Sequence, residues 1–225
     1  MSLHDEREVL PRLARLDSCA LSDALDKLSI PSRVATGLAP RSVPGRIAGR
    51  VHTVKLEAGE GRGTGARPRH LGTTAIEAAA SGEVIVLEQR TGCDAACWGG
   101  LLSRGAKLKE IAGIIADGPV RDVDEAREIG FPVYSRGVTA RTARGRIHES
   151  GTDVPVRIAD VDVHPGDYAL ADSSGVVFLR PERLIEVLGV AEAIAAREAA
   201  MLERIAAGRS IAEVLGGEYE RMLRE

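Results

Sequence analysis

The chain has 225 residues, of which 44% are hydrophobic and 28% are charged, and its formal net charge is −3. The length fits one domain with a large core, and the composition argues against an intrinsically disordered chain. The slightly negative charge and the 3% aromatic content argue against direct binding of nucleic acid or of an anionic membrane surface.

We expect neither an export signal nor a membrane span. Residues 1–16 include acidic side chains and no unbroken apolar region, and no apolar run reaches transmembrane length. Cys19, Cys93 and Cys97 are odd in number and form no disulfide framework. These features predict a protein of the reducing cytoplasm.

The first thirty residues predict two helices. Residues 6–16 carry apolar side chains at helical spacing, and Asp17 or Ser18 is positioned to cap a second helix that ends before Pro31. After a proline-rich connection, the pattern predicts a strand over residues 47–56.

A glycine-rich segment follows, with glycine at every second position from Gly59 to Gly65. A phosphate-cradling loop and a plain flexible loop are the two interpretations. The segment lacks the Lys-Ser/Thr ending of a P-loop and the spacing of a dinucleotide fingerprint, so we favour the flexible loop. Arg67 and Arg69 lie just beyond it and could reach toward a carboxylate of a substrate.

The middle of the chain alternates strands and helices. Strands are expected near residues 83–88, 112–117 and 132–135, which predicts a parallel core with right-handed crossovers. Asp94 is expected to cap the helix between the first two strands. The turn-forming residues Asp117-Gly118-Pro119 are expected to close the second strand.

From residue 145 the pattern changes to short strands separated by turn signals, which predicts antiparallel hairpins. Pro181 opens a long amphipathic helix that runs to about Ala207 and is stopped by Gly208. The expected strands cover residues 154–158, 161–163, 168–171 and 176–179.

The strongest functional signal lies in residues 99–122. Gly99-Gly100 opens an apolar helix whose free amides attract an anion, and Arg121-Asp122 follows a strand end, where open α/β sheets bind ligands. The planar Arg121 guanidinium suits a carboxylate or keto oxygen, and Asp122 offers oxygen to a hard divalent cation. This pattern predicts a site for a 2-oxo acid and its enolate. The alternative is that Asp122 only caps a helix while Arg121 makes a surface ion pair, and the spacing leaves both open.

Other residues give weaker signals. Cys93 and Cys97 are four residues apart and close to Asp94, but zinc normally takes four ligands, so idle thiols are favoured. His70 and Trp98 are candidates for a pocket wall, and core packing is favoured for Trp98.

The run DGPVRDVDEAREIGFPVYSRG at residues 117–137 resembles the RraA-like family (regulator of RNase E activity A). Matching stretches extend the resemblance over nearly the whole chain, namely LSDALDKL, SGEVIVLE and PGDYALADSSGVVFL. The resemblance implies a single domain over residues 1–225 with an α/β fold, a swivelling α/β/β sandwich. It has N-terminal helices within residues 1–30 and C-terminal helices within 181–225. It also implies homotrimers or homohexamers with sites between subunits.

The family includes class II 4-hydroxy-4-methyl-2-oxoglutarate/4-carboxy-4-hydroxy-2-oxoadipate aldolases. The resemblance therefore implies a carbon–carbon lyase that needs Mg²⁺ or Mn²⁺ and acts on a 2-oxo acid through a pyruvate enolate. Oxaloacetate decarboxylation runs through the same enolate and is a second expected activity. By resemblance, Asp122 is the metal ligand, Arg121 binds pyruvate and is catalytic, and Glu198 is the catalytic acidic residue that reaches a neighbouring subunit's site. The backbone amides that would hold the substrate carboxylate are those of Gly99, Gly100, Leu101 and Leu102.

One position departs from the family pattern. Family aldolases carry an acidic residue where this chain has Gly100, and Asp94 and Asp117 are the candidates to replace it. Gly100 also keeps open an alternative function, a non-catalytic regulatory protein that binds and inhibits a ribonuclease. The presence of Gly99, Arg121 and Asp122 favours the enzyme.

Overall fold

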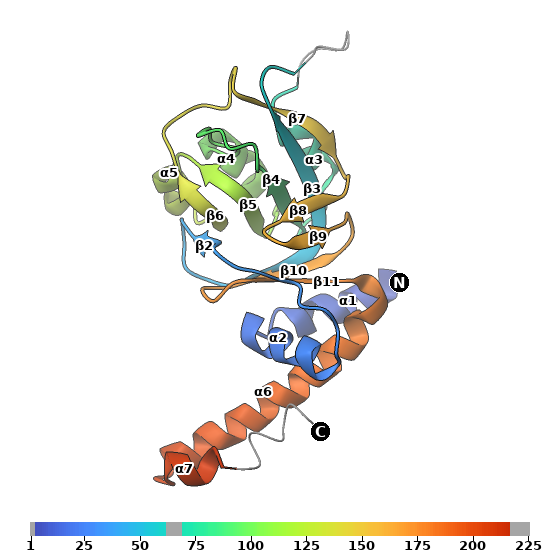
Figure 1. The fold of residues 1–225 in the computed structure, drawn as a ribbon, viewed down its shortest axis with the longest axis vertical. Coiled ribbons are helices and arrows are strands. Elements are labelled where there is room, and N and C mark those ends of the chain that lie inside the picture. Colours follow the sequence, from blue (N-terminus) through green and yellow to red (C-terminus); the bar gives the residue numbers. More distant parts are fainter. Residues whose placement is uncertain (1–2, 62–68, 217–225) are drawn as a thin grey trace.

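The structure is a computed structural model that describes residues 3–61 and 69–216 (Figure 1). Gly63 and Gly65 of the predicted glycine-rich loop, and Arg67 just beyond it, lie outside the described residues. Within the described part of the chain, no helix is long and apolar enough to cross a membrane.

A mixed, curled β-sheet organises the described residues. Its hydrogen-bonded order is β1-β11-β10-β3-β4-β5-β6-β2, and β7 pairs with β3 away from this path. Strands β3, β4, β5 and β6 are mutually parallel, which confirms the predicted parallel core. The strands are β1 (Val34–Ala35), β2 (Ala39–Pro40), β3 (Ile47–Ala58), β4 (Val84–Glu88), β5 (Gly113–Val120), β6 (Val133–Val138), β7 (Ile147–Thr152), β10 (Tyr168–Ala171) and β11 (Val176–Leu179).

Both faces of the parallel core are covered. Helices α3 (Thr73–Ala78), α4 (Gly100–Leu108) and α5 (Val123–Glu128) pack on one face, and the antiparallel hairpin of β8 (Val156–Ile158) and β9 (Val161–Val163) packs on the other (Figure 1). In β4, the alternate residues Ile85 and Leu87 join the core on the helix side, whereas Val84 and Val86 join the core on the hairpin side. The unbroken apolar run of β4 therefore reflects burial on two faces.

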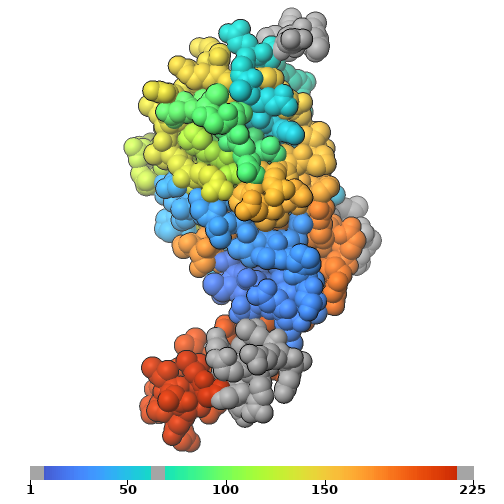
Figure 2. Space-filling view, in the orientation of Figure 1, coloured from blue at the N-terminus to red at the C-terminus, as the bar shows by residue number. Residues whose placement is uncertain are grey.

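A second group of helices packs on β10 and β11. Its members are α1 (Leu3–Leu13), α2 (Ser18–Lys27) and α6 (Leu184–Ala206), the last preceded by the 3₁₀ turn η1 (Pro181–Arg183) and followed by α7 (Ile211–Val214). Asp17 caps α2, because its carboxylate accepts a hydrogen bond from the Ala20 amide at 2.8 Å. In the space-filling view, the blue N-terminal helices adjoin the strand-rich body, while the red end of α6 and α7 projects away from it (Figure 2).

Two local predictions are wrong. Strand β5 does not end at Asp117 but continues through Asp117-Gly118-Pro119 to Val120, with an irregular register against β6 between Ala116 and Pro119. Such an irregularity accommodates a proline within a strand. Asp94 does not cap α4; the N-cap residue is Gly99, which makes no side-chain capping bond. Asp94 instead lies 3.4 Å from the guanidinium of Arg141.

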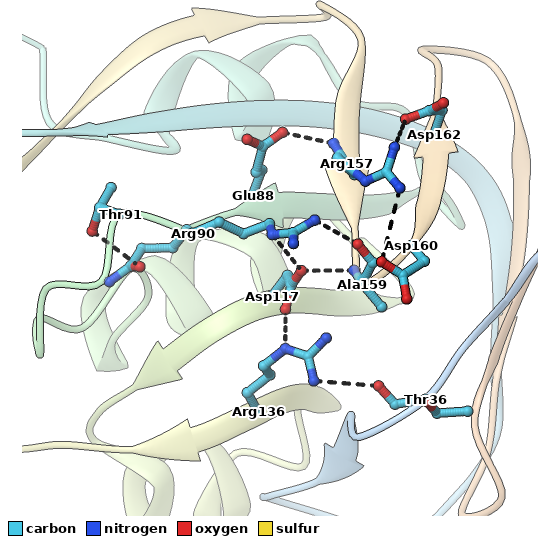
Figure 3. A network of polar contacts seen from close by, with 11 residues as sticks. Thr36, Glu88, Arg90, Thr91, Asp117, Arg136, Arg157, Ala159, Asp160 and Asp162 are labelled. Carbon is cyan, nitrogen blue, oxygen red and sulfur yellow. Dashed lines mark hydrogen bonds and ion pairs between the residues drawn. The ribbon is translucent and has the colours of Figure 1, made fainter.

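The buried carboxylate of Asp117 explains why the strand continues. Its side chain is 1% exposed and faces the β8–β9 hairpin, where it accepts hydrogen bonds from the Ala159 amide at 2.7 Å and from Arg136 Nε (Figure 3). Arg90 Nε lies 3.9 Å from the same carboxylate. These partners compensate the burial of the Asp117 carboxylate, which would otherwise favour a turn.

Candidate functional site

A small pocket of about 70 Å³ lies where α4 begins and β5 ends. Its wall includes Gly99, Gly100, Leu101, Leu102, Arg121 and Asp122, the residues predicted to bind a 2-oxo acid and a metal. His70 and Trp98 also line it, as the sequence suggested. The structure therefore brings together segments that are twenty residues apart in the chain.

The backbone fixes this arrangement. The Arg121 amide donates to the Trp98 carbonyl at 2.9 Å, which ties the end of β5 to the residue before Gly99. Trp98 is 2% exposed and its indole donates to Ser103 Oγ, so this residue packs in the core as predicted. The first helical bond of α4 runs from the Ser103 amide to the Gly99 carbonyl, at 3.0 Å. The amides before Ser103 therefore have no partner in the preceding turn of the helix.

Asp122 directs its carboxylate across to α4. Although it is the N-cap residue of α5, its side chain makes no capping bond to that helix. Its Oδ2 accepts a hydrogen bond from the Gly100 amide at 2.9 Å and lies 3.4 Å from Arg121 Nε. Its backbone is left-handed, with φ 56° and ψ 40°, a conformation that aspartate tolerates better than most residues. The carboxylate therefore joins two elements at the pocket wall rather than capping α5.

Gly99 makes room for these two side chains. A Cβ atom at this position would lie 2.9 Å from Asp122 Oδ2 and 3.3 Å from Arg121 Nε. The Gly99 backbone is extended, with φ −156°, so its conformation does not require glycine. Close approach of the Arg121 and Asp122 side chains is the reason for glycine here.

We expect Gly99→Ala to disturb the pocket without unfolding the chain. The added methyl group would displace Asp122 and Arg121 by a few tenths of an ångström or more, so activity at this site should fall roughly 10- to 100-fold. The measurement is steady-state kinetics together with thermal unfolding. Gly105→Ala on the same helix is the control, because its Cβ would meet nothing within 4 Å. Equal kinetics for the two variants would contradict this account of Gly99.

A broader groove of about 680 Å³ adjoins the pocket and shares Arg121 and Asp122 with it. Arg41 and Arg127 add positive charge to its wall. Arg41 donates to the carbonyl oxygens of Ser135 and Arg136, whereas Arg127 pairs with Asp124. Sequence reasoning missed both arginines, because Arg41 is eighty residues from Arg121 in the chain and neither belongs to a motif.

Comparison with known proteins identifies the family. The model of the RraA-like family, described as Aldolase/RraA, matches residues 18–178. This chain belongs to the RraA-like family. Its sheet, its covering helices and its long C-terminal helix are therefore an RraA-like fold, as the resemblance implied.

The relatives of this RraA-like chain carry different protein names. Protein DlpA of Legionella pneumophila is 30% identical over 203 residues, which are 90% of this chain but 32% of DlpA, so the chain spans about a third of that protein. The 4-hydroxy-4-methyl-2-oxoglutarate aldolase of Thermus thermophilus is 30% identical over 138 residues, 60% of this chain and 76% of the aldolase. Streptomyces coelicolor RraAS2, described as an unusual member of the RNase ES inhibitor RraA protein family, has a TM-score of 0.75 at 25% identity. That match covers 88% of this chain and 96% of RraAS2.

Glu198 does not join the pocket of its own chain. It lies on α6, which packs on α1 and α2, whereas α4 and α5 lie at the other end of the molecule (Figure 1). Partial burial raises the pKa of the Glu198 carboxyl group, and the nearby carboxylates of Asp23 and Asp17 raise it further. The prediction that Glu198 reaches a neighbouring subunit's site requires a second copy of the chain.

Neither candidate for the missing RraA-like acidic residue lies at Gly100. Asp94 is held near Arg141, and Asp117 faces the β8–β9 hairpin on the opposite side of the sheet from α4. Of the other weighed residues, Arg69 pairs with Glu77 at 3.1 Å in an exposed position. Burial raises the pKa of the Cys97 thiol to about 12, so this side chain is a protonated core group.

Proposed function

We propose that this protein is a divalent-metal-dependent carbon–carbon lyase that acts on a 2-oxo acid through a pyruvate enolate. The observation that carries the proposal is the shared pocket of the Asp122 carboxylate, the Arg121 guanidinium and the first turn of α4. The named aldolase relative supports an aldolase-like reaction on 4-hydroxy-4-methyl-2-oxoglutarate or a similar hydroxy acid. Oxaloacetate decarboxylation is the second activity proposed for the same pocket.

The oxygen donors at the pocket fit Mg²⁺ or Mn²⁺. No group of three or more His, Cys, Asp or Glu side chains within the described ranges could hold a metal. Magnesium, however, commonly binds proteins through one or two carboxylates and keeps several waters. Asp122 offers such a carboxylate, with its side chain 35% exposed at the pocket wall. When bound, the cation would supply Lewis-acid polarisation of the keto group.

The chain's own residues would bind and orient the substrate. The amides of Leu101 and Leu102, at the N-terminus of α4, suit the carboxylate of a 2-oxo acid because they carry partial positive charge. Arg121 would orient the keto oxygen and stabilise the negative charge that develops on it as the carbon–carbon bond breaks. The buried Trp98 and the neighbouring apolar wall would restrict water at the reacting carbon.

The proposal extends to assembly and location. A homotrimer or homohexamer would let Glu198 of a second copy face the pocket as a catalytic acidic residue. A cytoplasmic location is also proposed, since Cys19, Cys93 and Cys97 are free thiols.

The test is an assay of pyruvate release from oxaloacetate and from 4-hydroxy-4-methyl-2-oxoglutarate, with Mg²⁺, with Mn²⁺ and with chelator. Metal-dependent release from the hydroxy acid is the expected result for an aldolase. Release from oxaloacetate alone would indicate a decarboxylase, or an aldolase for another hydroxy acid. If neither compound releases pyruvate in the presence of metal, the lyase proposal fails for these substrates.

A second candidate function is binding and inhibition of a ribonuclease. The observation that favours it is the similarity to RraAS2, which is described as an unusual member of the RNase ES inhibitor RraA protein family. Capture of a purified ribonuclease by a protein that binds no divalent metal would support this function over the lyase.

A further inference from the structure

We propose that Glu125 supplies a second carboxylate to the cation site at Asp122, from the space that a side chain at position 100 would fill. This inference rests on the proposed function and assigns a further residue to the same site. Glu125 lies on α5, and neither the Arg121-Asp122 motif nor the lining of the small pocket identifies it.

The geometry at Gly100 carries the inference. A Cβ atom built on Gly100 would overlap Glu125 Oε2 and would lie 2.8 Å from Glu125 Cδ. The same Cβ position is 3.2 Å from Asp122 Cβ. The carboxylate of Glu125 therefore lies directly against the first residue of α4, beside Asp122, where only a glycine leaves room for it.

Asp122 and Glu125 approach the same residue of α4 from one helix. Asp122 is the N-cap residue of α5 and Glu125 lies three residues later within the helix, and atoms of both side chains lie close to Gly100. The Gly100 amide already donates to Asp122 Oδ2 at 2.9 Å. The Asp122 carboxylate is thus held at the N-terminus of α4 with the Glu125 carboxylate beside it, and the helix dipole offsets only part of the repulsion between them.

The pairing of the surrounding charges leaves Glu125 available. On the same helix, Asp124 pairs with Arg127, but the side chain of Glu125 makes no ion pair or hydrogen bond with the part of the chain described here. Arg121 is the cation nearest to Asp122, and its Nε is 3.4 Å away. A divalent cation would neutralise the two carboxylates that this arrangement brings together.

The test is the affinity for Mn²⁺ alone, measured by electron paramagnetic resonance on the wild-type chain and on Glu125→Gln. We expect Glu125→Gln to raise the Kd for Mn²⁺ roughly 10- to 100-fold. Glu128→Gln is the matched control, because Glu128 is an exposed glutamate at the end of the same helix. Equal affinities of Glu125→Gln and Glu128→Gln would overturn the proposal, as would a wild-type chain that binds no Mn²⁺.

Moving the carboxylate provides a second test. The double variant Gly100→Asp/Glu125→Ala returns a carboxylate to the same space from α4, so it should bind Mn²⁺ more tightly than Glu125→Ala alone. No gain in Mn²⁺ affinity in the double variant would contradict the shared position. If Mn²⁺ affinity responds as expected but neither substrate releases pyruvate, the role of Glu125 stands and the lyase proposal fails.

Discussion

Asp122→Asn is expected to lower metal-dependent pyruvate release by at least about 100-fold, because it removes the negative charge that would hold the cation. Asparagine is the informative replacement. It tolerates the left-handed backbone of residue 122, and its amide oxygen can still accept the hydrogen bond from the Gly100 amide. The fold should therefore persist while the reaction is lost. Kinetics at saturating Mg²⁺, together with a thermal unfolding curve, measure the two effects separately.

Asp160→Asn is the control for this variant. Its carboxylate is 97% exposed in the turn of the β8–β9 hairpin and lies 3.8 Å from Arg157. This hairpin packs on the opposite face of the sheet from α4. Asp160→Asn should leave both turnover and melting temperature unchanged. If Asp122→Asn turns over substrate at the wild-type rate, Asp122 is not the metal ligand, and the cation must be sought elsewhere.

Much of the fold follows from local patterns. The apolar runs of β4 and β5 and the glycine pair at the start of α4 predict a parallel core and a helix start, and the structure contains both. Arg121 and Asp122 stand next to each other at a strand end, where open α/β sheets bind ligands. The structure places both at the pocket beside α4. Strand β7 was missed because its sequence, IHESGT, has no apolar alternation and is only partly buried.

The composition of the site is harder to predict, because it depends on contacts between elements. Glu125 reads in the sequence as a solvated charge on a short helix. Only the packing of α5 against α4 brings its carboxylate to Gly100. In the same way, Asp117 is near the site in sequence, but its carboxylate lies on the opposite face of the sheet, where it pairs with Arg136. Proximity in the chain therefore gave a wrong candidate in Asp117 for the missing acidic residue.

Asp117 shows why a strong turn signal failed, and it carries the largest expected effect on stability. Asp-Gly-Pro normally ends a strand, but here the carboxylate is buried and receives hydrogen bonds from Ala159 and Arg136 (Figure 3). Asp117→Ala removes both interactions and leaves the Ala159 amide without its partner. We expect the free energy of unfolding to fall by about 2–4 kcal/mol, seen as a lower urea midpoint at an unchanged slope.

Asp162→Ala, on the same hairpin, separates burial from charge. Asp162 also pairs with an arginine, Arg157 at 3.1 Å, but its side chain is 66% exposed, so its loss should cost no more than about 1 kcal/mol. Asp117→Asn refines the comparison, because its amide oxygen can still accept from Ala159 while the charge facing Arg136 is gone. If Asp117→Ala costs no more than Asp162→Ala, the buried carboxylate does not anchor the hairpin. The continuation of β5 to Val120 would then depend on strand pairing with β6 instead.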